Sequence, residues 1–421
     1  MDRPTTDSGA QDALRRRLGT TDAVLIGLGA MLGAGIFAAL APAAAAAGSG
    51  LLLGLALAAV VAYCNATSSA RLAARYPASG GTYVYGRERL GDFWGYLAGW
   101  GFVVGKTASC AAMALTAGAY LWPDHAHPVA VAAVVALTAV NYAGVQKSAR
   151  LTRAVVAVVL AVLAAVVAAV FASGETDAAR LSLGGDITAG GVLQAAGLLF
   201  FAFAGYARIA TLGEEVRDPA RTIPRAVPVA LGITLVVYAL VAVAVLSVLG
   251  PGELAGAEAP LADAARAAGA AWLAPLVRIG AAVAALGSLL ALILGVSRTT
   301  LAMARDRHLP PALAAVHPRY KVPHRAELAV GAVVAVLAAT ADLRGAIGFS
   351  SFAVLAYYAV ANAAAWTLTP AEGRPPRIVP AVGLAGCLTL AFALPVSSVL
   401  AGAAVLAIGA AVYGIRRITA D

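Results

Sequence analysis

The sequence contains few charged residues: Asp, Glu, Lys and Arg make up only 12% of its 421 residues, against about 25% in soluble domains. Cysteine is also scarce. Cys64, Cys110 and Cys387 each lie in an apolar stretch, without the spacing of a metal site or a disulfide framework. Hydrophobic residues make up 61% of the chain, and its mean hydropathy is +0.84. This composition excludes a soluble globular domain and predicts an integral, multi-pass protein of the cytoplasmic membrane, with the lipid bilayer as its surroundings.

Twelve apolar runs are long enough to cross a membrane, which takes about 20 residues in a helix. We therefore predict an all-α integral membrane protein with about 12 transmembrane helices. The ninth and tenth runs lie close together, and we place their division at Asp342. The approximate limits of the runs are 22–46, 50–74, 93–120, 128–146, 152–172, 190–214, 226–249, 272–302, 326–341, 344–368, 377–394 and 397–415.

The net charge of +9 comes from the short loops between these runs and not from a nucleic-acid-binding patch. With the N-terminus inside, 24 of the 30 Lys and Arg residues lie on the cytoplasmic side, and the outer loops hold only Arg180, Arg266 and Arg344. This asymmetry predicts that both termini are cytoplasmic. Residues 1–18 form a polar cytoplasmic tail in this interpretation, and 19–421 form a single membrane domain. We also expect a short helix over the outer face within residues 253–269.

The first apolar run contains four glycines between Gly27 and Gly35, and each costs a helix roughly 1 kcal/mol relative to alanine. Backbone that leaves a helix within lipid must line a cavity or be buried in protein. We predict a break at Gly33–Gly35, with a half-helix that begins near Ile36. The alternative is close packing through small residues, because Gly29 and Gly33 have the spacing of a helix contact.

A second interruption occurs one half-chain later, at residues 200–208. Paired interruptions in corresponding halves indicate the binding site of a secondary transporter. Amides freed at Ala34, Gly35 and Ile36 form a donor site suited to a carboxylate, and freed carbonyls are suited to an ammonium. An α-amino acid has both groups. The predicted substrate-binding residues are Ala30, Met31, Gly33, Ala34, Gly35, Ile36, Phe203, Ala204, Gly205, Tyr206 and Arg208.

Four segments occur in the order of a known transporter family. The loop Arg75–Tyr85 resembles the P-x-S-G-G-x-Y-x-Y loop of the amino acid–polyamine–organocation transporters, and Gly33–Phe37 resembles the break in their first helix. Phe200–Pro219 resembles their sixth helix, and Ser297–Pro318 resembles their eighth helix and the following loop. Each motif is weak alone, but the four together are specific and cover residues 20–370.

This resemblance implies two inverted repeats of five helices, at about 20–172 and 190–369, followed by two extra helices at about 376–416. It also implies uptake or exchange of amino acids or related amines by alternating access. Phe203, at the second interruption, is a candidate gate over the ligand. Glu215 would pair with loop arginines as a cytoplasmic gate. The alternatives are core packing for Phe203 and a solvated helix end for Glu215.

Lys106 lies near the middle of the third run, and an ionisable residue at this depth is a candidate functional site. No carboxylate occurs at a comparable depth, so Lys106 must bind backbone carbonyls, bind the substrate carboxylate or lose its proton. Many proton-coupled relatives carry a lysine in helix 5, where this chain has Val159. Either Lys106 couples proton and substrate, or the protein is an exchanger or facilitator. A structural lysine that binds carbonyls is the remaining alternative.

Relatives that carry cationic amino acids often have an acidic residue just after the break in helix 6. Here the matching residue is Ala207, and Arg208 follows it. We therefore predict a permease for a neutral or acidic amino acid. Its transport is expected to be coupled to protons or to proceed by exchange. A carrier of cationic amino acids, polyamines or amines is the alternative, and a channel or membrane sensor is the alternative class. We expect no enzyme activity and no cofactor, because the runs contain no cluster of catalytic side chains.

Overall fold

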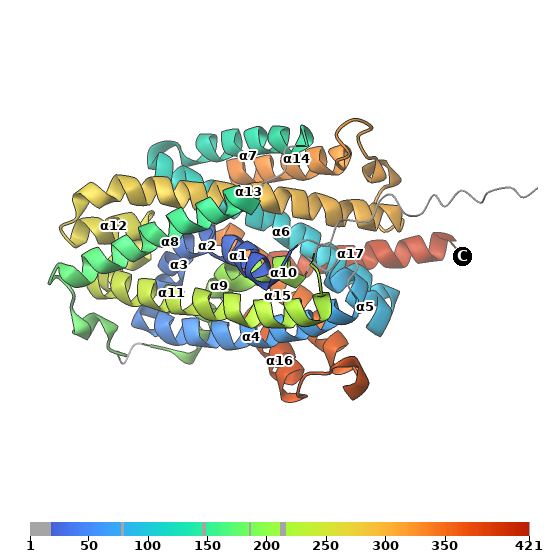
Figure 1. The fold of residues 1–421 in the computed structure, drawn as a ribbon, viewed down its shortest axis with the longest axis horizontal. Helices are drawn as coiled ribbons and strands as arrows, with labels where there is room; N and C mark the ends of the chain where they lie inside the picture. The colour runs from blue at the N-terminus through green and yellow to red at the C-terminus, as the bar shows by residue number, and fades with distance from the viewer. Residues whose placement is uncertain (1–17, 77–79, 145–148, 185–186, 211–215, 421) are drawn as a thin grey trace, which may run out of the picture.

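The computed structural model describes residues 18–76, 80–144, 149–184, 187–210 and 216–420. Within these ranges the regular elements are helices, apart from an isolated parallel bridge between Leu18 and Val216. Long helices run roughly along one axis of the molecule (Figure 1). In chain order the elements are α1 (Thr20–Met31), α2 (Ala34–Ala38), α3 (Leu40–Ala47), η1 (Gly48–Gly50), α4 (Leu51–Arg75), α5 (Thr82–Leu90), α6 (Asp92–Leu121), η2 (Pro123–His125), α7 (Ala126–Tyr142), α8 (Ala149–Ala172), η3 (Ala178–Leu181), α9 (Ala189–Phe203), η4 (Ala204–Tyr206), α10 (Ala207–Ala210), α11 (Pro219–Gly256), α12 (Pro260–Ala267), η5 (Ala271–Leu273), α13 (Ala274–Arg305), η6 (Pro311–Ala314), α14 (His324–Thr340), α15 (Leu343–Trp366), η7 (Pro370–Glu372), α16 (Ile378–Ala393) and α17 (Val396–Ala420).

Each predicted run coincides with one helix or with a group of consecutive helices, so the all-α membrane class is confirmed. In the described ranges, ten helical stretches are long and apolar enough to cross a membrane. α14 and α16 have 17 and 16 residues and are shorter than the usual crossing of about 20. The count of twelve and the inverted repeats stay predictions.

Capping side chains explain where two of the long helices begin. The Asp342 carboxylate accepts a hydrogen bond of 2.8 Å from the Gly345 amide and starts α15. Thr188 accepts one of 3.0 Å from the Gly191 amide and starts α9. Such a bond satisfies an amide that has no partner within the helix. The predicted division between the ninth and tenth runs at Asp342 is therefore confirmed.

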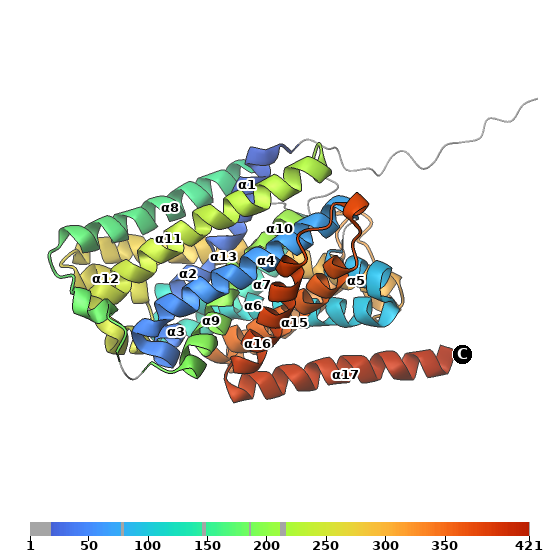
Figure 2. The ribbon, with the colours of Figure 1, turned by 90° about the horizontal axis from the view of Figure 1, so that it is seen from below.

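The most buried long helices are α1, α6, α9 and α15, so both interrupted segments lie in the centre of the bundle. α17 lies along its outside against α6 and α15 (Figure 2). It exposes Val396, Leu400 and Ile418, each more than 60% accessible. Apolar side chains with such large exposed fractions on the outside of a helical bundle are typical of a surface in contact with lipid.

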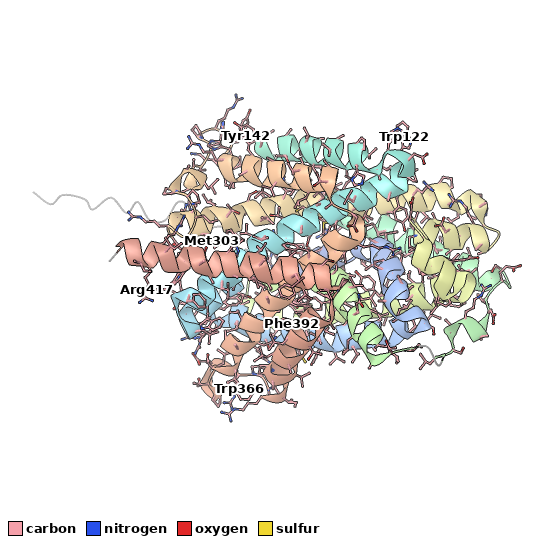
Figure 3. All side chains as sticks on the ribbon, turned by 180° about the vertical axis from the view of Figure 1, so that it is seen from behind. Trp122, Tyr142, Met303, Trp366, Phe392 and Arg417 are labelled. Carbon is pink, nitrogen blue, oxygen red and sulfur yellow. The ribbon has the colours of Figure 1, made fainter. Side chains whose placement is uncertain are left out.

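The two ends of the bundle differ in character. Arg417 and Tyr142 lie near one end and Trp122 near the other (Figure 3). We call the first the basic end, because arginines of α4, α5 and α17 make their polar contacts there. At the opposite end α12 forms the short helix expected within residues 253–269, and the Leu261 amide donates to the Tyr120 hydroxyl. α12 covers this end of the central helices.

Candidate substrate site

The first apolar run is interrupted within the membrane region, as the glycines predict. α1 ends at Met31, and Leu32 (ψ 37°) and Gly33 (φ −90°, ψ −142°) leave the helical conformation. The next half-helix begins at Ala34, two residues before the predicted start near Ile36. Ala34, Gly35 and Ile36 therefore form the first turn of α2, where amides have no carbonyl partner in the preceding turn.

The glycines of this run also allow close contacts. A Cβ atom on Gly33 would lie 2.2 Å from the Ser288 hydroxyl oxygen of α13, and one on Gly35 would lie 2.5 Å from the Cα atom of Ala202 in α9. A Cβ atom on Gly29 would meet Thr152 of α8 at 3.1 Å. The break and the close packing, which the sequence offered as alternatives, thus occur together. A large side chain at Gly35 would force α2 away from α9.

The second interruption is a tightening of the helix and not an unwinding. α9 passes through the 3-10 turn η4 into α10, and the residues that flank the turn stay in helical conformation. A Cβ atom on Gly205 would lie 2.4 Å from the Ala30 carbonyl oxygen and 2.7 Å from the Met31 amide nitrogen. The two interrupted segments therefore touch through their backbones, which only glycine at this position permits.

Tyr238 of α11 joins the two segments, and the sequence analysis did not identify it. Its hydroxyl is 2.5 Å from the Met31 carbonyl oxygen and 3.1 Å from that of Ala202, and it donates to both. The side chain is 1% exposed. Its ring lies 5.2 Å from that of Phe203. A tyrosine within an apolar run has no sequence signal that marks it as the partner of a break elsewhere in the chain.

The structure shows how the other candidates in this region are arranged. The Ser288 hydroxyl donates to the Gly29 carbonyl at 3.4 Å. Phe203 and Tyr206 are fully buried but point toward different neighbours, because Tyr206 stacks on Tyr358 of α15 at 5.1 Å. Arg208 is partly exposed in α10, beyond η4, and interacts with other residues of the chain. Of the two predicted aromatic residues, Phe203 is therefore the one that packs beside Tyr238 at the junction of the two segments.

Among the described residues, Lys106 forms no hydrogen bond with the carbonyls of this junction. It is 6% exposed in α6 and makes no hydrogen bond or ion pair within the described ranges. Ala117, about three turns further along α6, packs with Ala34 of α2, and Met113 packs against the same cluster. Side chains on a helix lean toward its N-terminus, which takes the Lys106 ammonium still further from the break. Lys106 therefore lies nearer the basic end than the part of α6 that contacts α2.

At the basic end, two of the segments quoted for the family resemblance contact each other. The Tyr83 hydroxyl lies 2.5 Å from an Asp306 carboxylate oxygen and 2.8 Å from Nδ1 of His308, and Arg87 donates to the same Asp306 oxygen at 2.7 Å. A carboxylate only accepts hydrogen bonds. Tyr83 must therefore donate its proton to Asp306 and accept a hydrogen bond from Nδ1 of His308. Burial, followed by the hydrogen bond to Asp306, raises the pKa of Tyr83.

A second group of charges ties α5 to the loop after α15. The Glu372 carboxylate accepts hydrogen bonds from Arg89 and from the Thr369 amide, and lies 3.5 Å from Arg75. The hydrogen bond from Arg89 is the main cause that lowers the pKa of Glu372 to about 2. Glu215, the predicted gate residue, lies outside the described residues. Within the described residues, these two charged groups join separate segments of the basic end.

Residues 18–413 of this chain match the family model described as amino acid permease. The chain belongs to this family. The transporter named Rv1999c from Mycobacterium tuberculosis (strain H37Rv) is 78% identical over 99% of this chain and 95% of its own length, and its name calls it an uncharacterized transporter. The branched-chain amino acid permease BcaP of Bacillus subtilis is 26% identical over 91% of this chain and 89% of its own length. The chloroplastic cationic amino acid transporter 7 of Arabidopsis thaliana is 29% identical over 86% of this chain and 67% of its own length.

We predict that Tyr238→Phe destabilises the junction, because it leaves two buried carbonyls without their shared donor. Leaving buried polar groups unsatisfied costs about 1–3 kcal/mol. The thermal unfolding midpoint of the purified variant should fall below that of the wild type. Tyr63→Phe is the matched control, since Tyr63 is half exposed on the outside of α4 and should behave as wild type. Equal midpoints for both variants would show that the Tyr238 hydroxyl does not hold the junction.

A second prediction concerns pH. Burial lowers the pKa of His308 below its usual 6.5, with Asp306, Arg87, Asp92 and Arg416 as the charged groups around it. The unfolded chain therefore takes up a proton near pH 6.5 while the folded chain does not, and stability falls as the pH drops below 6.5. His308→Gln keeps a donor for Tyr83 and should lose less stability between pH 7.5 and 5 than the wild type. His125→Gln, at an exposed position, is the control. Parallel stability curves for wild type and His308→Gln would contradict the prediction.

Proposed function

We propose that this member of the family is a secondary active transporter that moves a neutral or acidic amino acid across the cytoplasmic membrane by alternating access. The observation that supports it most is the backbone contact between the two interrupted segments at Ala30 and Gly205. In this proposal the basic end is cytoplasmic, both chain termini lie on that side, and the charged groups on Asp306 and Glu372 keep it closed.

The substrate carboxylate is held at the first turn of α2, by the amides of Ala34, Gly35 and Ile36. Gly33 and the helical start at Ala34 support this role, since amides at a helix start attract an anion. The ammonium lies against carbonyls at the end of α1 and around η4, from Ala30, Phe203 and Ala204. The Met31 carbonyl already accepts from Tyr238, so an ammonium there must share it with the tyrosine hydroxyl.

Arg208 and Ala207 support a neutral or acidic side chain, because neither offers a negative charge next to η4. The names of the relatives point in both directions: one is a branched-chain amino acid permease and another a cationic amino acid transporter. A carrier of cationic amino acids, polyamines or amines is therefore the second candidate. A channel or sensor lacks a reason for two interrupted helices that meet at one point.

Purified protein in liposomes tests both candidates. We expect saturable counterflow of a radiolabelled neutral or acidic amino acid, inhibited poorly by arginine, lysine or putrescine. Strong inhibition by micromolar arginine would overturn the proposed selectivity but not the transport. Conductance without saturation would overturn the carrier itself.

We further propose that Lys106 couples transport to protons, with exchange or facilitated transport as the alternatives. A charged lysine in the membrane interior costs about 2.5–3.5 kcal/mol on insertion scales, and no described side chain of this protein offsets that cost. Within the described ranges it makes no hydrogen bond to the freed carbonyls in this conformation. It would instead exchange its proton when the basic end opens.

Lys106→Met should therefore lose accumulation of substrate driven by a pH difference, while exchange across equal pH persists. The measurement is uptake into liposomes with and without an imposed pH gradient. Lys321→Met, at an exposed loop position, is the control and should accumulate substrate as wild type does. Accumulation by Lys106→Met under a pH difference alone would place the coupling site elsewhere.

A further inference from the structure

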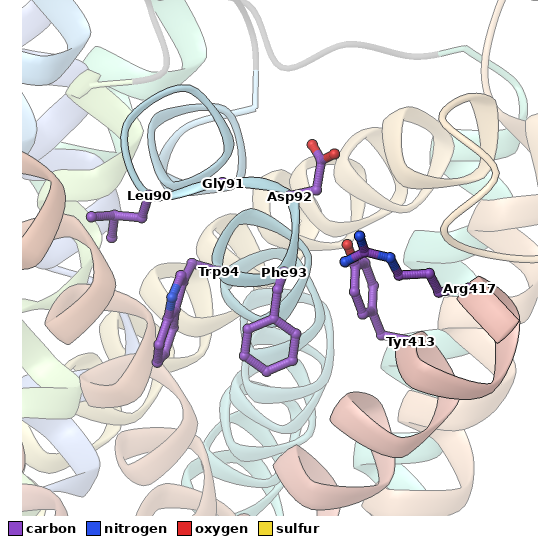
Figure 4. A pocket seen from close by; sticks show the side chains of 7 residues that line it. All are labelled: Leu90, Gly91, Asp92, Phe93, Trp94, Tyr413 and Arg417. Atoms are coloured by element: carbon purple, nitrogen blue, oxygen red, sulfur yellow. The ribbon is translucent and has the colours of Figure 1, made fainter.

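A hollow of about 510 Å³ lies at the basic end, between the start of α6 and the last turns of α17 (Figure 4). It is separate from the junction of α1 and η4. Asp92 and Arg417 contribute the charged side chains of its lining, and Phe93, Trp94 and Tyr413 contribute the aromatic ones. The lining residues come from two distant parts of the chain, residues 90–94 and residues 413 and 417. The hollow therefore depends on the packing of α17 against α6.

The two charged side chains of this hollow have opposite signs and do not pair. Within the described ranges, Asp92 and Arg417 make no ion pair with each other, and neither makes a hydrogen bond or ion pair with another residue. In Figure 4 the carboxylate of Asp92 and the guanidinium of Arg417 lie apart, with the Tyr413 ring beside the guanidinium. A ligand with one negative and one positive group could contact both at once.

The aromatic side chains of this hollow are of the kind that gathers at the level of lipid headgroups. The Phe93 ring packs against Trp94 at 5.3 Å and against Tyr413 at 5.5 Å, so the three form one wall. Trp94 is nevertheless 46% exposed, and Ile415 and Ile418 of the adjoining helix are exposed as well. Tryptophan and tyrosine gather where membrane and water meet. We therefore infer that the hollow lies where membrane and water meet.

We propose that this hollow binds the headgroup of a phospholipid that carries a primary amine. The phosphate lies on Arg417, because a guanidinium donates paired hydrogen bonds to phosphate oxygens. The ammonium lies at Asp92 and over the aromatic wall, which attracts cations through its ring faces. An anionic headgroup without an amine meets repulsion from Asp92, and a quaternary amine has no N–H to donate to that carboxylate.

Native mass spectrometry of the full chain in detergent tests this, with phosphatidylethanolamine, phosphatidylcholine or phosphatidylglycerol added. Phosphatidylethanolamine should be retained best. Arg417→Gln and Asp92→Asn should each weaken its retention roughly three- to fivefold, the size of one partly exposed charged contact. Arg377→Gln is the matched control: Arg377 lies over the ring of the exposed Trp366, outside the hollow, and its loss should leave retention unchanged. Unfolding midpoints equal to wild type establish that the variants are folded.

Three results would overturn the proposal. The first is equal retention of phosphatidylcholine and phosphatidylethanolamine. The second is a preference for phosphatidylglycerol that Asp92→Asn strengthens, and the third is equal weakening by Arg377→Gln. Soluble glycerophosphoethanolamine separates lipid from free headgroup: binding as tight as that of the lipid would make a soluble phosphoamine the ligand. Weak competition by this compound, together with retention of the lipid, supports a lipid site.

Discussion

Lipid offers no hydrogen bonds, so each backbone group that leaves a helix within the membrane needs a partner from the protein. In this permease the requirement is concentrated where α1 stops and α2 begins. One hydroxyl, on Tyr238, serves the Met31 carbonyl of one segment and the Ala202 carbonyl of the other. The remaining contact is direct, with Gly205 against Ala30. The rest of the bundle keeps these few atoms together and away from lipid.

This arrangement gives a physical reason for a movable site. A carbonyl has two lone pairs, so the Met31 carbonyl can accept from a substrate ammonium and from the Tyr238 hydroxyl together. The charged contacts at the basic end have a similar character: the pairs of Arg87 with Asp306 and Arg89 with Glu372 are partly exposed. Such pairs contribute little each and can separate without unfolding a helix. In the proposed mechanism, substrate alters the first set of contacts and opening alters the second.

The sequence was informative where the constraint is local. Long apolar runs predicted the helices, Asp342 predicted the division between two of them, and the glycines predicted a break within two residues of its place. The sequence was weaker where the constraint comes from a distant partner. Nothing local shows that η4 tightens instead of unwinding, because its shape depends on the Ala30 backbone that Gly205 meets. Tyr238 was missed for the same reason, and the place of Lys106 in the bundle depends on how α6 packs against α2.

Hydrogen–deuterium exchange of the reconstituted protein, with and without a transported amino acid, tests the central claim most directly. If the substrate binds at the junction, it should slow exchange of amides in peptides that cover residues 32–38 and 203–207. Peptides from α7 and α17, which lie away from the junction, should exchange at unchanged rates. Protection confined to other segments, with residues 32–38 unaffected at saturating substrate, would contradict the assignment of the amino acid site.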